Sequence, residues 1–102
     1  MIAQSIDISN SSGTGLVGYV ITSYDDLVKV FGKPVITNEK TNVVWTVRFD
    51  DDKKTVATIY DWKERSVPMG KYAWHIGGHS AEAVRLVQEM LDTTLESNHE
   101  SV

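Results

Sequence analysis

The sequence contains no cysteine, and this excludes several kinds of chemistry at once. Without thiols the chain has no disulfide, no thiolate metal site and no thiol nucleophile. Three histidines remain as soft metal ligands, but His99 lies in a polar C-terminal segment. His75 and His79 flank a predicted strand end, turn and helix start, so their i, i+4 spacing does not place them on one helix face. We therefore predict no metal site and no cofactor.

Long apolar runs are also missing. No stretch approaches the roughly 18 apolar residues that suggest a transmembrane helix. The N-terminus has no basic region followed by an apolar run, which would mark a secretory signal. The sequence therefore predicts no membrane association and a cytoplasmic location.

Basic residues are few and scattered. The chain has 10 Lys and Arg against 14 Asp and Glu, which gives a formal net charge of −4. Non-specific nucleic-acid binding needs clustered basic side chains, so we expect no nucleic-acid partner. The long carboxylate runs of a DNA mimic are missing as well, because only residues 50–52 and the C-terminal tail come near.

The strong phosphate-binding and hydrolase signatures are not found either. The chain has no G-x-x-x-x-G-K-[ST], no strand-linked G-x-G-x-x-G and no G-x-S-x-G. A set of Ser80, His79 and Asp61 could be written as a triad, but a chain this rich in Ser and Asp contains such sets by chance. A weak hydrolase stays a minor alternative, and the sequence favours a non-catalytic protein.

The apolar pattern of the 102 residues predicts one domain over residues 1–96, followed by a frayed tail over residues 97–102. Alternation predicts strands, and helical spacing with Ser and Gly caps predicts helices. The expected strands cover residues 2–8, 16–22, 43–49, 55–62 and 72–76, and the expected helices cover residues 24–31 and 81–95. We predict an α+β fold, a largely antiparallel five-stranded sheet with two helices packed on one face (β-β-α-β-β-β-α).

The stretch from Trp74 to Ser80 is the main candidate for a binding site. Alternation predicts that Trp74 is buried while His75 faces solvent. Gly77 and Gly78 then supply a positive φ or a close backbone approach, and Ser80 caps the following helix. Free N–H groups at such a helix start can hold an anion. The alternative, an ordinary strand-turn-helix connection, stays open.

Three segments are expected to supply one binding site for a nucleotide or another flat anion. Aromatic rings would stack, a lysine would neutralise charge and backbone N–H groups would donate hydrogen bonds. The alternative is that the aromatic side chains serve packing alone. The candidate ligand-binding residues are Ser12, Gly13, Thr14, Tyr60, Trp62, Lys63, His75, Gly77, Gly78, His79 and Ser80.

Several short motifs together resemble a family of small conserved proteins encoded by tailed bacteriophages. The motifs are Ser12-Gly13-Thr14, Gly18-Tyr19, Phe31-Gly32-Lys33-Pro34, Ile59-Tyr60-Asp61-Trp62-Lys63 and Trp74-His75-Ile76-Gly77-Gly78. The resemblance covers roughly residues 10–92, and Gly15-Leu16-Val17 departs from it where a more polar segment is expected. It implies a phage protein made in the host cytoplasm and supplies no catalytic residues.

Two functions of different class follow from these observations. In the first, the protein binds or sequesters a nucleotide-like small anion as a counter-defence module. In the second, it is a protein–protein interaction module that inhibits a host defence enzyme. The expected partners are thus a nucleotide-like small molecule or a host protein, and a homo-oligomer is left open.

Overall fold

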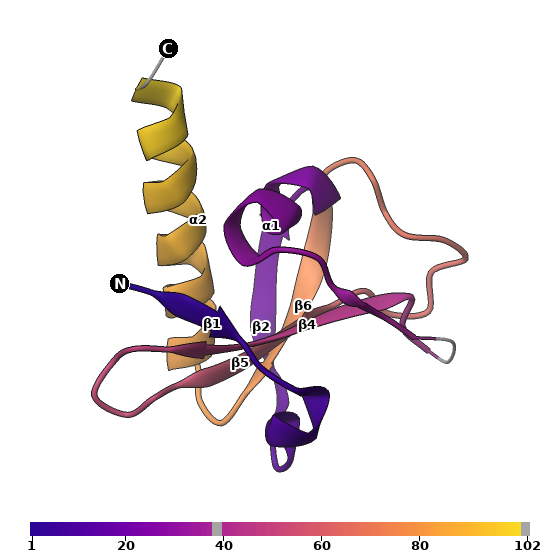
Figure 1. Cartoon of the computed structure of the whole chain (residues 1–102). Helices are drawn as coiled ribbons and strands as arrows, with labels where there is room; N and C mark the ends of the chain where they lie inside the picture. The colour runs from indigo at the N-terminus through magenta and orange to yellow at the C-terminus, as the bar shows by residue number, and fades with distance from the viewer. Residues whose placement is uncertain (38–39, 101–102) are drawn as a thin grey trace.

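A six-stranded antiparallel sheet forms the centre of the fold, with strand order β1-β4-β5-β6-β2 and the short β3 paired to β4 (Figure 1). The computed structural model describes residues 1–37 and 40–100, with side chains described through residue 96. The elements are β1 (Ala3–Ser5), η1 (Ile8–Ser11), β2 (Gly15–Thr22), α1 (Tyr24–Phe31), β3 (Val35–Ile36), β4 (Val43–Phe49), β5 (Val56–Tyr60), β6 (Tyr72–Gly78) and α2 (Glu82–Glu100). The α+β fold predicted from the sequence is confirmed.

The core lies between one face of the sheet and the two helices. Alternate residues of β4, β5 and β6 point into it and meet apolar side chains of α1 and α2 in a single buried cluster. Trp45 and Trp74 pack edge to face at its centre, with ring centroids 5.5 Å apart. Their indole N–H groups donate to the carbonyl oxygens of Gly32 and Thr22, at 2.8 and 3.1 Å. The two tryptophans therefore fix both ends of α1 to the sheet.

Local capping sets the limits of α1 as the sequence predicts. The Ser23 side chain accepts a hydrogen bond from the Asp26 N–H at 3.2 Å. Gly32, at φ 86°, ends the helix and donates its N–H to the Val28 carbonyl at 2.9 Å. A left-handed residue after the last turn favours glycine, so this end of the helix follows from the sequence.

Strand β6 is longer than predicted, and this corrects the reading of the two glycines. Gly77 and Gly78 are buried strand residues that pair with both neighbouring strands, and neither has a positive φ. A β-carbon on Gly78 would lie 2.6 Å from the Ala83 β-carbon, and one on Gly77 would lie 2.2 Å from the Thr58 hydroxyl oxygen. Close packing, and not a turn, therefore requires glycine at both positions.

Other boundaries also differ from the prediction. The two-residue β3 makes the sheet six-stranded, and η1 begins at the last residue of the strand predicted over residues 2–8. Strand β5 ends at Tyr60, two residues before the predicted end. Helix α2 continues to Glu100, so the backbone of residues 97–100 is helical where a frayed tail was predicted, while residues 101–102 lie outside the described part. No Gly or Pro interrupts α2, which is why its backbone can continue past the last apolar position.

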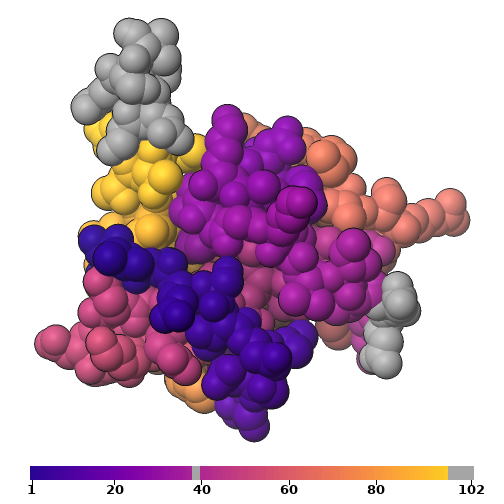
Figure 2. Space-filling view, in the orientation of Figure 1, coloured from indigo at the N-terminus to yellow at the C-terminus, as the bar shows by residue number. Residues whose placement is uncertain are grey.

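The N-terminal segment crosses the face of the sheet opposite the helices. Element η1 packs against β4 and β5 there. In Figure 2 this segment, in indigo, lies on the surface beside the pink turn that joins β4 to β5. It leaves the β6 and β2 end of the face uncovered, and the exposed Tyr19 and Ile21 lie there.

Candidate functional site

A row of aromatic side chains crosses the face of the sheet opposite the helices. In the register, Tyr60 lies directly across from His75, and His75 directly across from Tyr19. Residues opposite each other in neighbouring strands share a face, so the three rings stand side by side. The His75 ring centroid is 5.4 Å from that of Tyr60 and 4.9 Å from that of Tyr19.

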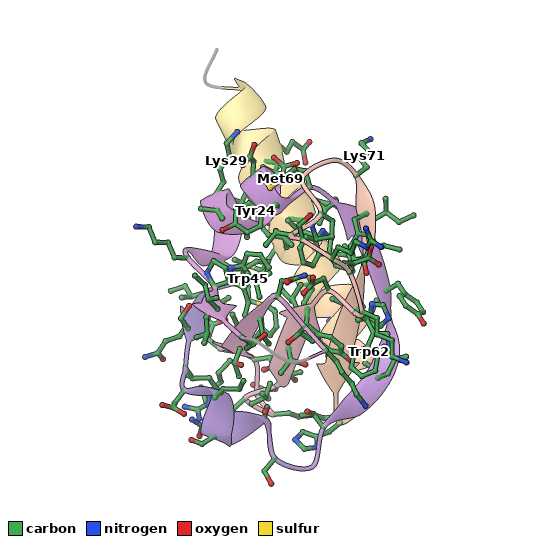
Figure 3. The ribbon with its side chains drawn as sticks, turned by 90° about the vertical axis from the view of Figure 1, so that its right-hand side faces the viewer. Tyr24, Lys29, Trp45, Trp62, Met69 and Lys71 are labelled. Atoms are coloured by element: carbon green, nitrogen blue, oxygen red, sulfur yellow. The ribbon has the colours of Figure 1, made fainter. Side chains whose placement is uncertain are left out.

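Trp62 extends this row just beyond the end of β5. Its ring centroid is 6.4 Å from those of both Tyr60 and His75. We call Tyr19, Tyr60, Trp62 and His75 the aromatic cluster. Figure 3 shows Trp62 well away from Trp45 and from Tyr24 on α1. The cluster therefore lies outside the core, and Tyr19 and Trp62 are 53% and 39% exposed.

Two lysines approach the exposed end of this cluster. The Nζ atoms of Lys40 and Lys63 lie 5.7 and 5.8 Å from the Trp62 ring centroid, within cation–π range. The Lys63 N–H donates to the Lys40 carbonyl at 2.7 Å, so the backbone holds both residues together. Lys63 also has a φ of 55°, which non-glycine residues adopt uncommonly. Two cations beside an indole ring form a place where an anion with a flat ring system could bind.

A buried carboxylate fixes the segments that carry these lysines. Asp61 is fully buried, and its Oδ1 accepts from the N–H groups of Asn42 and Val43 at 2.8 and 3.2 Å. Its Oδ2 accepts from the Asn42 side-chain amide at 2.6 Å. The start of β4 is thereby tied to the chain that leaves β5, directly beside Trp62. Asp61 therefore has a structural role.

His75 and Tyr60 are uncharged near neutral pH. Burial holds the pKa of His75 below its usual value of 6.5, although the carboxylates of Asp61 and Glu64 oppose this shift. Burial also raises the pKa of Tyr60 above 10.0, so its hydroxyl keeps its proton. The His75 Nδ1 atom is buried without a hydrogen-bond partner among the described residues. A neutral, unsatisfied imidazole nitrogen is costly to bury and can be satisfied by a ligand or a water molecule.

A cavity of about 240 Å³ adjoins the cluster and shares Tyr60 with it. Its walls come from η1 and the segment after it, from the residues on either side of the β3–β4 connection, and from β4, β5 and β6. The lining residues are Ile8, Ser11, Thr14, Gly15, Thr37, Thr41, Val44, Thr58, Tyr60 and Gly77. Six of these carry a hydroxyl group and none carries a charge, so the cavity is polar but neutral.

The structure divides the sequence-predicted site residues into two groups. Tyr60, Trp62, Lys63 and His75 come together at one end of the sheet, and Thr14 and Gly77 line the adjoining cavity. The other five lie near the opposite end of β6, and they are Ser12, Gly13, Gly78, His79 and Ser80. There a β-carbon on Gly13 would lie 3.4 Å from the His79 ring. Strands β5 and β6 are antiparallel, so the residues that follow β5 and the residues that follow β6 lie at opposite ends of the strands.

The start of α2 has fewer free N–H groups than the sequence suggested. The Ser80 hydroxyl accepts from the Glu82 N–H at 3.3 Å, which agrees with a capping role. The Ser80 carbonyl accepts from the Ala83 N–H at 3.2 Å, and the Glu82 carboxylate pairs with Arg85 in the first turn. Asp61 also lies at the other end of the sheet from His79 and Ser80. The Ser80, His79 and Asp61 side chains therefore do not form a catalytic triad.

Sequence reasoning missed several residues of the site. Tyr19 belongs to the aromatic cluster, Lys40 approaches its Trp62, and Thr37, Thr41 and Thr58 line the cavity. The outward parity of Tyr19 in its strand was an available signal. Lys40 and the threonines gave none, because their approach depends on the pairing of distant segments.

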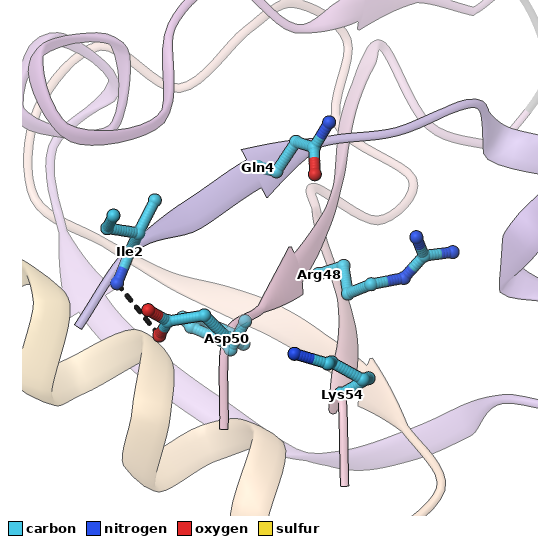
Figure 4. A pocket seen from close by; sticks show the side chains of 6 residues that line it. Ile2, Gln4, Arg48, Asp50 and Lys54 are labelled. Atoms are coloured by element: carbon cyan, nitrogen blue, oxygen red, sulfur yellow. Dashed lines mark hydrogen bonds between the residues drawn. The ribbon is translucent and has the colours of Figure 1, made fainter. Parts of the chain in front are cut away.

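A second, larger groove of about 490 Å³ lies where β1 meets β4 (Figure 4). Arg48 and Lys54 supply two cations there, and Gln4 supplies an amide. The Asp50 carboxylate lies in the same groove and accepts the Ile2 N–H at 2.9 Å. Because a carboxylate lies in this groove and no aromatic side chain other than Phe49 lines it, it suits a flat anion less well than the aromatic cluster.

Comparison with protein-family models, curated proteins and solved structures found no match to the chain. Among the side chains of residues 1–37 and 40–96, no group of three or more His, Asp or Glu could hold a metal ion. None of the helices in that part is both long and apolar enough to cross a membrane.

Proposed function

We propose that the protein binds a nucleotide-like small anion on the face of the sheet opposite its helices, without catalysing its conversion. The observation that carries this proposal is the pair of lysines, Lys40 and Lys63, placed over Trp62 beside the rings of Tyr60 and His75. A nucleobase would stack on the exposed rings, and the lysines would neutralise its phosphate. Both interactions are available within one short span of surface.

The biological setting of this proposal comes from the resemblance to small tailed-phage proteins. On that reading the protein acts in the host cytoplasm and sequesters a nucleotide-like signal of a host defence system. The resemblance rests on motifs that include Tyr60, Trp62, Lys63 and His75, which the structure brings together. Because these motif residues lie together, we link the phage setting to the aromatic cluster and its lysines.

The test is calorimetric titration with a panel of mononucleotides and cyclic nucleotides. Lys63→Gln should weaken binding by about 1.5–3 kcal/mol, or roughly 10- to 150-fold, because a charge-assisted contact is lost. Lys54→Gln is a matched control, since Lys54 has a φ of 53° against 55° for Lys63 and lies in the turn between β4 and β5. Failure of the whole panel to bind the wild type would refute the proposal.

A specific observation also favours the alternative, an interaction module that inhibits a host defence enzyme. A bulge between Leu16 and Gly18 brings Leu16 onto the same face as Tyr19 and Ile21. These three apolar side chains are 51%, 53% and 70% exposed on β2, an edge strand with no charged residue. An edge strand without charged residues can pair with a strand of another chain. That chain is a host protein in this alternative, and a second copy of the protein in a homo-oligomer.

These partners can be separated from the ligand by one pair of variants. Ile21→Lys places a charge on the β2 edge, and Ile36→Lys makes the same change at an isoleucine that is 79% exposed on β3. Loss of a co-purifying host protein, or of a dimer seen by light scattering, in Ile21→Lys alone would support the interaction module. Retained nucleotide binding in both variants would support the ligand reading.

A further inference from the structure

Three of the six hydroxyl groups around the 240 Å³ cavity are arranged so that they can only accept further hydrogen bonds. The Ser11 hydroxyl donates to the Ile8 carbonyl at 2.7 Å, and the Thr14 hydroxyl donates to the Ser11 carbonyl at 2.7 Å. The Thr37 hydroxyl donates to the Thr41 carbonyl at 2.5 Å. Each of these hydroxyls has used its one proton, so its oxygen has only lone pairs left for a ligand.

Two further hydroxyls of the cavity are not used in this way. Thr58 is 6% exposed and Tyr60 is half-buried, and neither hydroxyl bonds to another described residue. The space in front of Thr58 exists because Gly77 lies opposite, where a β-carbon would come within 2.2 Å of the Thr58 oxygen. A threonine hydroxyl that faces a cavity and has no protein partner among the described residues is a group to which a ligand can hydrogen-bond.

This set of groups excludes a phosphate from the cavity. A phosphate offers only acceptor oxygens, which would face the lone pairs of Ser11, Thr14 and Thr37, and no cation lines the walls to compensate. A sugar hydroxyl both donates and accepts, so it can donate to these oxygens and accept from Thr58 or Tyr60. The volume is also below the roughly 300 Å³ at the lower end for drug-sized ligands, so the cavity would hold one part of a nucleotide.

We infer that this cavity binds the ribose of the ligand through its free hydroxyl groups, an inference that rests on the nucleotide-binding function proposed above. The base then lies on the aromatic cluster, whose Tyr60 is shared with the cavity, and the phosphate lies at Lys40 and Lys63. The protein accordingly prefers ribonucleotides to 2′-deoxyribonucleotides. The preference persists in uncharged nucleosides, because the cavity itself carries no charge.

The experiment measures binding of adenosine, guanosine, cytidine and uridine against their 2′-deoxy counterparts, together with the matching 5′-monophosphates. The wild type should bind the ribo form at least about tenfold more tightly, the equivalent of one lost hydrogen bond. Thr58→Val, which replaces the hydroxyl by a methyl group, should bring this ratio close to one.

Thr46→Val provides the matched control. Thr46 lies directly across from Thr58 in the neighbouring strand and is equally buried at 6%, but it does not line the cavity. It should keep the wild-type ratio. Circular dichroism and urea unfolding establish that both variants fold, and Tyr60→Phe serves as a second probe that removes the other unpaired hydroxyl.

The outcomes separate the two proposals. Equal affinity for ribo and deoxy ligands, or an unchanged ratio in both Thr58→Val and Tyr60→Phe, overturns the ribose site. If the monophosphates still bind the wild type and bind Lys63→Gln more weakly, the proposed nucleotide-binding function stands without the ribose site. Binding of no nucleoside and no nucleotide overturns both.

Discussion

Gly77 lies directly opposite Thr58 in the β5–β6 ladder, and a β-carbon on Gly77 would stand 2.2 Å from the Thr58 hydroxyl oxygen. Gly77→Ala should therefore destabilise the protein by about 1–3 kcal/mol, as overpacking of a tight site does. In the double variant with Thr58→Ala much of this loss should return, because the crowded atom is gone. Urea unfolding of the four proteins measures the coupling, and purely additive losses would contradict this contact.

Trp45 is 2% exposed, packs on Trp74 and donates to the Gly32 carbonyl. Trp45→Ala should cost about 3–5 kcal/mol in free energy of unfolding, since it leaves a large cavity. Trp62→Ala removes the same atoms from a surface position and should cost about 1 kcal/mol or less. Equal losses in the two variants would mean that the sheet faces are assigned the wrong way round.

The buried Asp61 carboxylate accepts three hydrogen bonds from Asn42 and Val43. Asp61→Asn keeps the shape but turns an amide N–H₂ toward one of these donors, so one buried donor loses its acceptor. We expect a loss of about 1–3 kcal/mol. Asp52→Asn, at an exposed position in the turn after β4, should change the free energy of unfolding by no more than about 0.5 kcal/mol. Thermal or urea unfolding at neutral pH makes the comparison.

His75 should make stability depend on pH in a defined direction. Its pKa is lowered in the folded state, so below about pH 6.5 the unfolded chain binds the proton more readily than the folded one. Stability contributed by the neutral ring is therefore complete above that pH and is lost as the pH falls toward the lowered pKa.

The control for this prediction is His75→Gln, which removes the titrating group. The slope of unfolding free energy against pH between about 5 and 7 should be smaller in this variant than in the wild type. Asp7 and Asp51, whose pKa values are lowered from 3.8 by hydrogen bonds from Ser9 and Thr55, act only at more acidic pH. An identical slope in the two proteins would show that His75 is not buried as described.

Much of the fold could be predicted because it depends on neighbours in the sequence. The alternation of residues 43–49 follows from the geometry of a strand, and Val43, Trp45, Val47 and Phe49 are buried on the face that it indicates. Val44 and Thr46 on the other face are buried as well, because η1 covers β4 there. Ser23 and Gly32 limit α1 through contacts within four residues. The sequence leaves the pair Gly77-Gly78 open between a positive φ and a close approach, because glycine serves for both, and only the atoms facing each glycine distinguish the two.

The sequence by itself determined the two helices and all the strands except β3, and which face of each points inward, because those properties depend on local backbone geometry and on hydrophobic spacing. The tertiary structure decided which of the predicted site residues meet. Antiparallel pairing separates His79 and Ser80 from Lys63, while the β2–β6 register brings Tyr19 to His75 and backbone contacts bring Lys40 to Lys63. Such meetings depend on pairing between segments far apart in the chain, and no local pattern encodes that register.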